Sequence, residues 1–333
     1  MSPQFRFLFF LCFIPLSNVS AQYTEMINVN RPGVSQGAFA VGKNVLQIET
    51  GFSYGKEKHE IIQTETTGMA MDYSIRYGFW REQFEVSVIG EYQANDITYN
   101  SGIEQKVSNF KSNTIGFKYL LYDPYKEMYH KKPDLYRWRK NNKFQWADFV
   151  PAVSLYAGIN VDFPDNPLTQ KNGSTTSPKF MITTQNNWVG GWVFVTNIIA
   201  DWGATTAPSY GYIVTLTHAT HRYFSIFIEN QGISNDYYAD QILRGGAATL
   251  INADLEVDLS FSVNFKDTPS KLYGRLGLAY RFDMHDQEEY IYDDVPEGQE
   301  KDQLKKARDA KRKQDRIDRK KARQERIDAR KEQ

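Results

Sequence analysis

The chain has 333 residues, and its 40 Lys or Arg balance 40 Asp or Glu to a formal net charge of zero at pH 7. Its mean hydropathy of −0.57 argues against membrane-spanning helices, which need roughly 20 consecutive apolar residues. A transmembrane β-barrel is not excluded, because strands that alternate apolar and polar side chains have a low average hydropathy. Aromatic residues make up 14% of the chain, and barrels use such residues as girdles at both membrane interfaces.

The first 21 residues have the pattern of a secretory signal peptide. A basic Arg6 precedes an apolar run at 7–14, and the small residues that signal peptidase prefers end at Ala21. We predict export and cleavage after Ala21. The single cysteine, Cys12, lies in this peptide, so the mature chain is predicted to contain no disulfide and no cysteine metal site.

The rest of the chain is dominated by segments in which every second residue is apolar, the period that is typical of β-strands. The clearest is LEVDLSFSVNF at 255–265. A tilted strand needs roughly 9–11 residues to cross a membrane, whereas strands of soluble proteins usually have about 5–6. The predicted strands span residues 44–54, 66–79, 83–96, 108–122, 149–163, 178–189, 192–203, 208–219, 222–231, 240–250, 254–266 and 271–282.

The lengths of the links also favour a barrel, because outer-membrane barrels have short periplasmic turns and longer external loops. If the first strand rises from the periplasm, the short periplasmic links are 80–82, 190–191, 219–221 and 251–253. The longer external links are then 55–65, 97–107, 164–177 and 232–239. Three links depart from the rule: 204–207 and 267–270 are external but short, and 123–148 is periplasmic but long.

The last predicted strand ends on its apolar face with Tyr280 and Phe282. We expect the barrel-insertion machinery of the outer membrane to read this closing strand. An even number of strands returns the chain to the periplasm. We therefore predict an all-β fold, an antiparallel transmembrane β-barrel of about 12 strands over residues 44–282, in the outer membrane of a Gram-negative bacterium. A soluble β-sandwich is the alternative, in which the apolar face would meet a second sheet rather than lipid.

Several stretches resemble a known family. They are Arg31-Pro32-Gly33, Val41-Gly42-Lys43, LQIETG at 46–51, PAVSL at 151–155 and GLAYRF at 277–282. Over residues 28–282 the chain resembles barrels of the putative MetA-pathway of phenol degradation family, often labelled outer-membrane transporters. Two departures are Asn30, where the family commonly has an acid, and Gly42, where it commonly has proline. The resemblance implies a barrel fold and a transport role.

Ten charged residues fall on the predicted inner faces, and acids are in excess. A ring of carboxylates would favour the passage of cations. Alternatively, these residues form salt bridges that fill the barrel, or the N-terminal residues 22–43 fold inward as a plug. Twelve strands lie between the roughly eight of packed barrels and the 16–18 of open porins, so width does not decide. The predicted lumen residues are Glu49, Asp72, Arg76, Glu85, Glu91, Asp201, Glu229, Glu256, Asp258 and Arg281.

Catalytic motifs do not accompany the strands. The chain has no G-x-S-x-G nucleophile elbow and no glycine-rich phosphate loop. His218 and His221 lie close together in a predicted turn, but no third ligand follows, and a histidine in a turn is usually solvated. We expect no enzymatic activity, no metal and no cofactor.

The C-terminal region separates its charges into two blocks. Residues 283–300 contain eight acids and no Lys or Arg, and residues 301–333 contain fifteen Lys or Arg and seven acids. The second block lacks Gly and Pro and has too few apolar positions for a coiled coil, which predicts a solvated, charged periplasmic helix. Export removes nucleic acid as a partner. The basic tail is either solvated beside its acidic linker or a tether to an acidic periplasmic or cell-wall partner.

A second unusual segment lies at 123–148, where aromatic and basic residues are interleaved. It would lie on the anionic inner leaflet or form a locally packed turn with solvated cations. Taken together, the sequence predicts an outer-membrane barrel, in contact with membrane lipid, that passes or binds small solutes, hydrophobic ones included. The alternative is a structural or assembly protein whose filled barrel anchors the tail.

Overall fold

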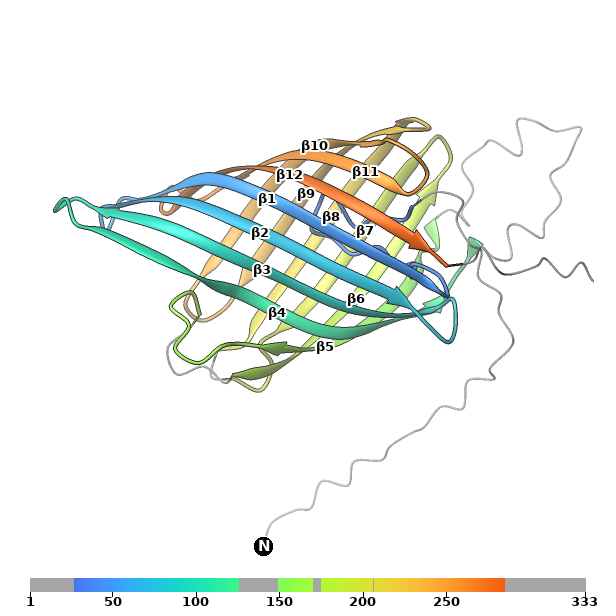
Figure 1. Cartoon of the computed structure of the whole chain (residues 1–333), viewed down its shortest axis with the longest axis horizontal. Helices are drawn as coiled ribbons and strands as arrows, with labels where there is room; N and C mark the ends of the chain where they lie inside the picture. Colours follow the sequence, from blue (N-terminus) through green and yellow to red (C-terminus); the bar gives the residue numbers. More distant parts are fainter. Residues whose placement is uncertain (1–26, 126–148, 170–174, 206, 285–333) are drawn as a thin grey trace, which may run out of the picture. The chain divides into compact units, whose positions relative to one another are not determined.

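The computed structural model describes residues 27–125, 149–169, 175–205 and 207–284. Within these residues twelve antiparallel strands form a closed barrel, in which β1 pairs with β12 and every other pair is formed by successive strands (Figure 1). The strands are β1 (Val45–His59), β2 (Thr64–Gly78), β3 (Phe84–Tyr99), β4 (Glu104–Tyr122), β5 (Ala152–Val161), β6 (Thr176–Trp188), β7 (Trp192–Asp201), β8 (Ser209–His221), β9 (Phe224–Ser234), β10 (Ala239–Leu250), β11 (Leu255–Asn264) and β12 (Ser270–Asp283).

The barrel predicted from the alternating pattern is confirmed, but two of its external loops are not. The β1–β2 and β3–β4 links occupy only 60–63 and 100–103, because these strands continue beyond their apolar stretches. The extensions carry polar side chains, and their ladders place opposite charges together, as in the pair Asp96 and Lys106. Backbone hydrogen bonds hold a hairpin whether or not its side chains are apolar, so the end of the apolar pattern marked the edge of the membrane rather than the end of the strand.

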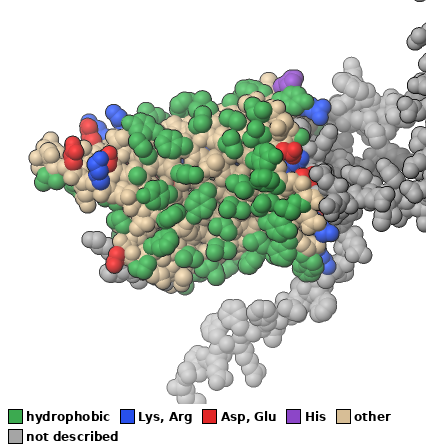
Figure 2. All heavy atoms as spheres, in the orientation of Figure 1, with side chains coloured by type: hydrophobic (Ala, Val, Ile, Leu, Met, Phe, Trp, Pro, Cys, Tyr) green, Lys and Arg blue, Asp and Glu red, His purple; other side chains and the backbone are tan. Residues whose placement is uncertain are grey.

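Side chains alternate across the barrel wall. On β11, Leu259 and Phe261 are 47% and 59% exposed on the outside, whereas Asp258 and Ser260, which alternate with them, are each 2% exposed. Figure 2 shows apolar side chains spread over the outer surface of the strands, with charged side chains gathered near the ends of the barrel. The apolar face therefore meets membrane lipid and the polar face lines the lumen.

Residues 27–44, here called the N-terminal segment, precede β1 and lie inside the barrel. The segment begins at Ile27, whose N–H donates to the Ala253 carbonyl in the β10–β11 link at 2.9 Å. Near its other end, Ala38 packs with Leu120 and Ala152 in an apolar cluster. Both contacts lie near the barrel end where the β10–β11 link and the end of β4 are found, the end that the sequence analysis assigns to the periplasm.

Several predicted features lie outside the described residues. These are the signal peptide at 1–21, nearly all of the linker and tail at 283–333, and most of the aromatic and basic segment at 123–148. In the part of the chain that the structure describes, no helix has the length and hydrophobicity needed to cross a membrane.

Candidate functional site in the barrel lumen

One row of residues crosses four neighbouring strands on the inner wall. Gly51 on β1 lies opposite Asp72 on β2 and Gly277 on β12, and Gly277 in turn lies opposite Asp258 on β11. The row therefore reads aspartate, glycine, glycine, aspartate. Because neither glycine has a side chain, the wall is flat between the two carboxylates and leaves space for another group.

Arg31 of the N-terminal segment fills this space. Its Nε donates to Asp258 Oδ2 at 2.7 Å, and its Nη1 forms an ion pair with Asp72 Oδ2. A methyl group added at Gly51 or Gly277 would overlap the guanidinium, so the side chain lies directly on the two glycines. Arg31 is 8% exposed and Asp258 is 2% exposed. A buried charge pair with a forked donor is the strong kind of ion pair, and removing one partner leaves the other charge uncompensated.

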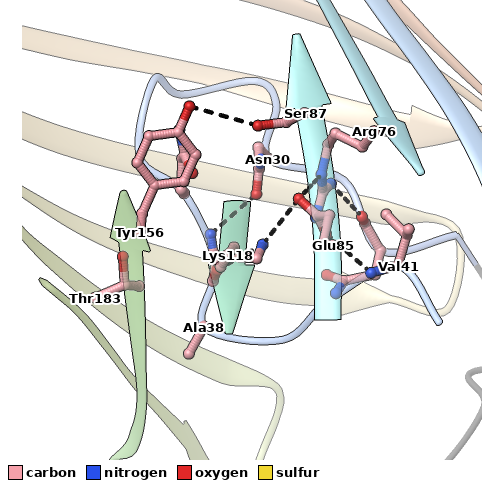
Figure 3. A network of polar contacts seen from close by, with 12 residues as sticks. Asn30, Ala38, Val41, Arg76, Glu85, Ser87, Lys118, Tyr156 and Thr183 are labelled. Atoms are coloured by element: carbon pink, nitrogen blue, oxygen red, sulfur yellow. Dashed lines mark hydrogen bonds and ion pairs between the residues drawn. The ribbon is translucent and has the colours of Figure 1, made fainter. Parts of the chain in front are cut away.

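A second buried cluster centres on Glu85. Arg76 donates from Nε and Nη2 to the two carboxylate oxygens of Glu85, at 2.9 and 3.0 Å (Figure 3). Lys118 Nζ lies 3.3 Å from Glu85 Oε1, and the Val41 N–H donates to Oε2 at 3.0 Å. Glu85 thus pairs with two cations of the wall and also holds the end of the N-terminal segment.

The two cations of this cluster also reach the segment. Arg76 Nη1 donates to Glu49 Oε1 at 2.9 Å and to the Asn28 carbonyl at 3.0 Å. Lys118 Nζ donates to the Gly37 carbonyl at 3.2 Å. Glu49 and Glu85 balance the charges of Arg76 and Lys118. The two cations donate further hydrogen bonds to backbone carbonyls of the segment.

Glu229 holds the middle of the segment by its backbone. Its carboxylate accepts from the N–H groups of Val34 and Ser35, at 3.0 and 3.1 Å to Oε2. Thr215 Oγ1 and Arg244 Nη1 donate to the same carboxylate at 2.8 and 3.0 Å. With this set of donors the charge of Glu229 is compensated, although the side chain is 0% exposed.

Two amide side chains continue the same mode of contact. Asn197 accepts from the Gln36 N–H at 2.7 Å and donates to the Gln36 carbonyl at 2.8 Å. Gln185 Oε1 accepts from the Ala38 N–H at 2.9 Å. The wall therefore binds residues 34–41 chiefly through their backbone, whereas Arg31 is bound through its side chain.

A polar cavity of about 370 Å³ lies beside the segment, with Val34 and Arg275 among its lining. Arg275 Nη2 donates to the Gly33 carbonyl at 2.9 Å, which links the cavity wall to the segment. The other charged side chains that line the cavity are Glu57, Asp72, Glu91, Lys111, Arg244 and Lys271, and neutral polar residues lie between them. The cavity thus offers hydrogen-bond donors and acceptors with both signs of charge.

Six of the ten predicted lumen residues contact the N-terminal segment. They are Glu49, Asp72, Arg76, Glu85, Glu229 and Asp258. Three others are paired within the wall: Glu91 with Lys111, Asp201 with Lys179 and Arg281 with Asp254, at 2.9, 2.8 and 2.7 Å. Glu256 is also on this face, and its Oε1 is buried without a hydrogen-bond partner.

The cations that compensate these acids were not among the ten predicted lumen residues. They are Arg31, Lys118, Arg244 and Arg275, of which Lys118 is fully buried. The excess of acids on the inner face was itself the signal, because buried carboxylates require positive partners. Most of the carboxylates are paired with these cations or with the segment. The inner wall therefore does not present the ring of free carboxylates that cation passage would use.

The predicted closing residues lie on the outer face of β12. Tyr280 and Phe282 are 38% and 44% exposed, and their rings meet edge to face with centroids 4.6 Å apart. Leu46 of β1 lies opposite Phe282, so the pair sits at the seam where the barrel closes. Recognition of this pair by the insertion machinery stays a prediction.

Solved structures of similar architecture are outer-membrane barrels. An outer-membrane channel from Pseudomonas putida F1 is 9% identical with a TM-score of 0.49, covering 74% of this chain and 98% of that one. The KdgM porin is 9% identical with a TM-score of 0.41, covering 70% and 99%. The CymD monoaromatic hydrocarbon channel is 7% identical with a TM-score of 0.40, covering 73% and 90%. No curated protein matches the chain in sequence.

A closed wall with a lipid-facing apolar surface and a polar interior defines this protein as a channel-like β-barrel of the outer membrane. The family model described as putative MetA-pathway of phenol degradation matches residues 29–282. The chain belongs to this family, as its motifs at the two ends of the barrel predicted. The match begins within the N-terminal segment and ends in β12. It therefore includes both the segment and the barrel wall that binds it.

Proposed function

We propose that the barrel is an outer-membrane channel for small solutes and that the N-terminal segment closes its lumen. The observation that carries the proposal is the mode of contact between the two. Side chains of β1, β2, β3, β4, β6, β7, β9, β11 and β12 hold the segment by hydrogen bonds and ion pairs. Such polar contacts can be exchanged for water when the segment moves, whereas a closely packed apolar core cannot.

The lining of the cavity beside the segment favours the binding of polar solutes over hydrophobic ones. Its wall combines charged side chains of both signs with Ser53, Asn95, Ser260 and Tyr273. A hydrophobic solute would leave these groups without partners, which costs free energy for each buried polar group. A small solute with its own donors and acceptors would replace the water that they bind.

Conductance in planar lipid bilayers tests the proposal. We expect the full-length barrel to conduct weakly, and a variant that lacks residues 27–43 to show a several-fold larger and continuous conductance. The matched control lacks residues 285–333, beyond the last strand, and should conduct like the full-length protein. Folding of each variant is checked by its heat-modifiable migration on gels. A folded variant that stays silent without residues 27–43 would show that wall side chains alone fill the lumen.

A second candidate function is supported by the charges of the C-terminal tail. Fifteen Lys or Arg and seven acids in residues 301–333 suit a tether to an acidic periplasmic or cell-wall partner, with the filled barrel as its anchor. Exposed charges attract one another only within roughly 8–10 Å at ordinary ionic strength, so such an association is sensitive to salt.

Deleting residues 285–333 tests the tether. All twelve strands end before this point, so we expect normal insertion of the truncated barrel. Co-purification from cross-linked envelopes at low and high salt should recover a partner with the full chain that is lost with the truncated one. Identical partners for both proteins would reduce the tail to a solvated appendage.

A further inference from the structure

We propose that Asp72, Asp258, Gly51 and Gly277 form a binding site for a guanidinium or amidinium group, which Arg31 occupies as an internal ligand. These four residues are called the guanidinium site below. The site belongs entirely to the barrel wall, on β2, β11, β1 and β12. Its shape is therefore set by the register of four paired strands and does not depend on the N-terminal segment.

The geometry of the site suits a planar cation. The two carboxylates stand at opposite ends of the row, and the two glycines between them provide a flat floor on which the guanidinium lies. Neighbouring strands are about 4.8 Å apart, so the row spans roughly 14 Å between the outer Cα atoms. A guanidinium presents several N–H groups in one plane and can donate to carboxylates on two sides, whereas an ammonium is a compact point charge.

The charge that remains when Arg31 leaves also calls for a cation. Within the described residues, Arg31 is the partner that the structure gives to Asp258, which is 2% exposed. Asp72 keeps Arg275 Nη1 at 3.7 Å. A vacated site would thus hold carboxylates with too few cations, which is costly in a buried place.

A solute that carries a guanidinium or amidinium group would compete with Arg31 for this site. Because the backbone contacts of residues 34–41 do not depend on side-chain identity, Arg31 is the charged side chain that anchors the segment. Displacing it would loosen the segment and open the lumen. This last step rests on the channel function proposed above, whereas binding at the site does not.

Rescue of Arg31→Ala by free guanidinium tests the site itself. The purified variant is refolded in detergent with millimolar guanidinium chloride or, at equal ionic strength, methylammonium chloride. Folding is measured as the heat-modifiable fraction over a range of temperatures. A ligand at about ten times its dissociation constant raises the ratio of folded to unfolded protein about tenfold. We expect this rise with guanidinium, and none with methylammonium.

Two controls separate the site from general effects of the ion. The double variant Arg31→Ala/Asp258→Asn should lose the rescue, and the wild type should respond much less than Arg31→Ala, because the solute must compete with Arg31 for the site. A variant lacking residues 27–43 vacates the site by another route and should also gain folded yield with guanidinium. If neither vacated variant gains more folded protein from guanidinium than from methylammonium, the proposal is overturned. If guanidinium rescues folding but the variant lacking residues 27–43 does not conduct in bilayers, the guanidinium site stands and the proposed channel function is refuted.

Discussion

At the scale of single residues, the family motifs meet in one place. Arg31 comes from the motif before the barrel, Gly51 from the first strand and Gly277 from the last. These positions are remote in sequence, yet the closure of β1 on β12 places Gly51 opposite Gly277, and Arg31 lies on both. The two glycines are needed for this close approach, because any side chain would occupy the place of the guanidinium.

Gly277→Ala is expected to weaken the attachment of the N-terminal segment. The added methyl group overlaps the Arg31 guanidinium and Asp258, and inserting a methyl group into a filled site costs about 1–3 kcal/mol. The measurement is the temperature at which the folded, heat-modifiable band is lost, which should fall.

Gly245→Ala provides the matched control. A Cβ at Gly245 would meet only the Phe227 carbonyl oxygen, at an ordinary contact distance of 3.7 Å. Alanine is also better suited than glycine to a strand. This variant should melt at or above the wild-type temperature. Equal losses in the two variants would mean that Gly277 is needed for the strand and not for Arg31.

At the scale of the strand, the alternation decides which face meets lipid. Leu259 is exposed on the outside of β11, and Ser262 on the same strand lines the polar cavity. Leu259→Arg should therefore impair insertion, because an arginine on the lipid face near the bilayer midplane costs about 2–4 kcal/mol. Ser262→Arg introduces the same charge on the other face and should be tolerated.

The yield of heat-modifiable protein in outer-membrane fractions compares the two arginine variants. Leu259→Arg is expected to give much less folded barrel than Ser262→Arg. Similar yields from both would contradict the assignment of the faces.

Strands β1–β4 also show that a strand can extend beyond its apolar pattern, since their outer ends remain paired between polar side chains.

At the scale of the whole molecule, the orientation of the barrel can be read with cysteine labels. The only cysteine, Cys12, lies in the predicted signal peptide, so the mature chain is predicted to be a cysteine-free background. Ile103 in the β3–β4 link and Ile251 in the β10–β11 link are 63% and 62% exposed, at opposite ends of the barrel.

A membrane-impermeant maleimide should label Ile103→Cys on intact cells and Ile251→Cys only after lysis. The reason is that an even number of strands places the start of β1, the end of β12 and the β10–β11 link on the periplasmic side, whereas the β3–β4 link lies on the external side. The two positions have nearly equal exposure, so a difference in labelling reports their side of the membrane. The reverse result would turn the barrel around and place the N-terminal segment at its external end.

The sequence by itself determined the wall of this barrel. A period of two is a local property of each strand, so the pattern of LEVDLSFSVNF at 255–265 was enough to assign Leu259 to the outside and Asp258 to the inside. The same pattern predicted the positions of the strands and the closing strand, and it placed five acids and Arg76 on the inner face, where they contact the N-terminal segment. It could not show where the ladders end, because pairing between polar residues leaves no apolar signal.

Only the tertiary structure decided what the lumen contains. The inner-face parity of Glu85 and Lys118 can be read from sequence, but their pairing depends on the register between β3 and β4. The attachment of Arg31 depends on the closure of β1 on β12, which joins residues from the two ends of the chain. A barrel whose inner acids are free and a barrel whose inner acids bind a segment can have the same amino-acid composition. The difference lies in three-dimensional pairing, because Coulombic attraction and hydrogen bonding act over a few ångströms in space and not along the sequence.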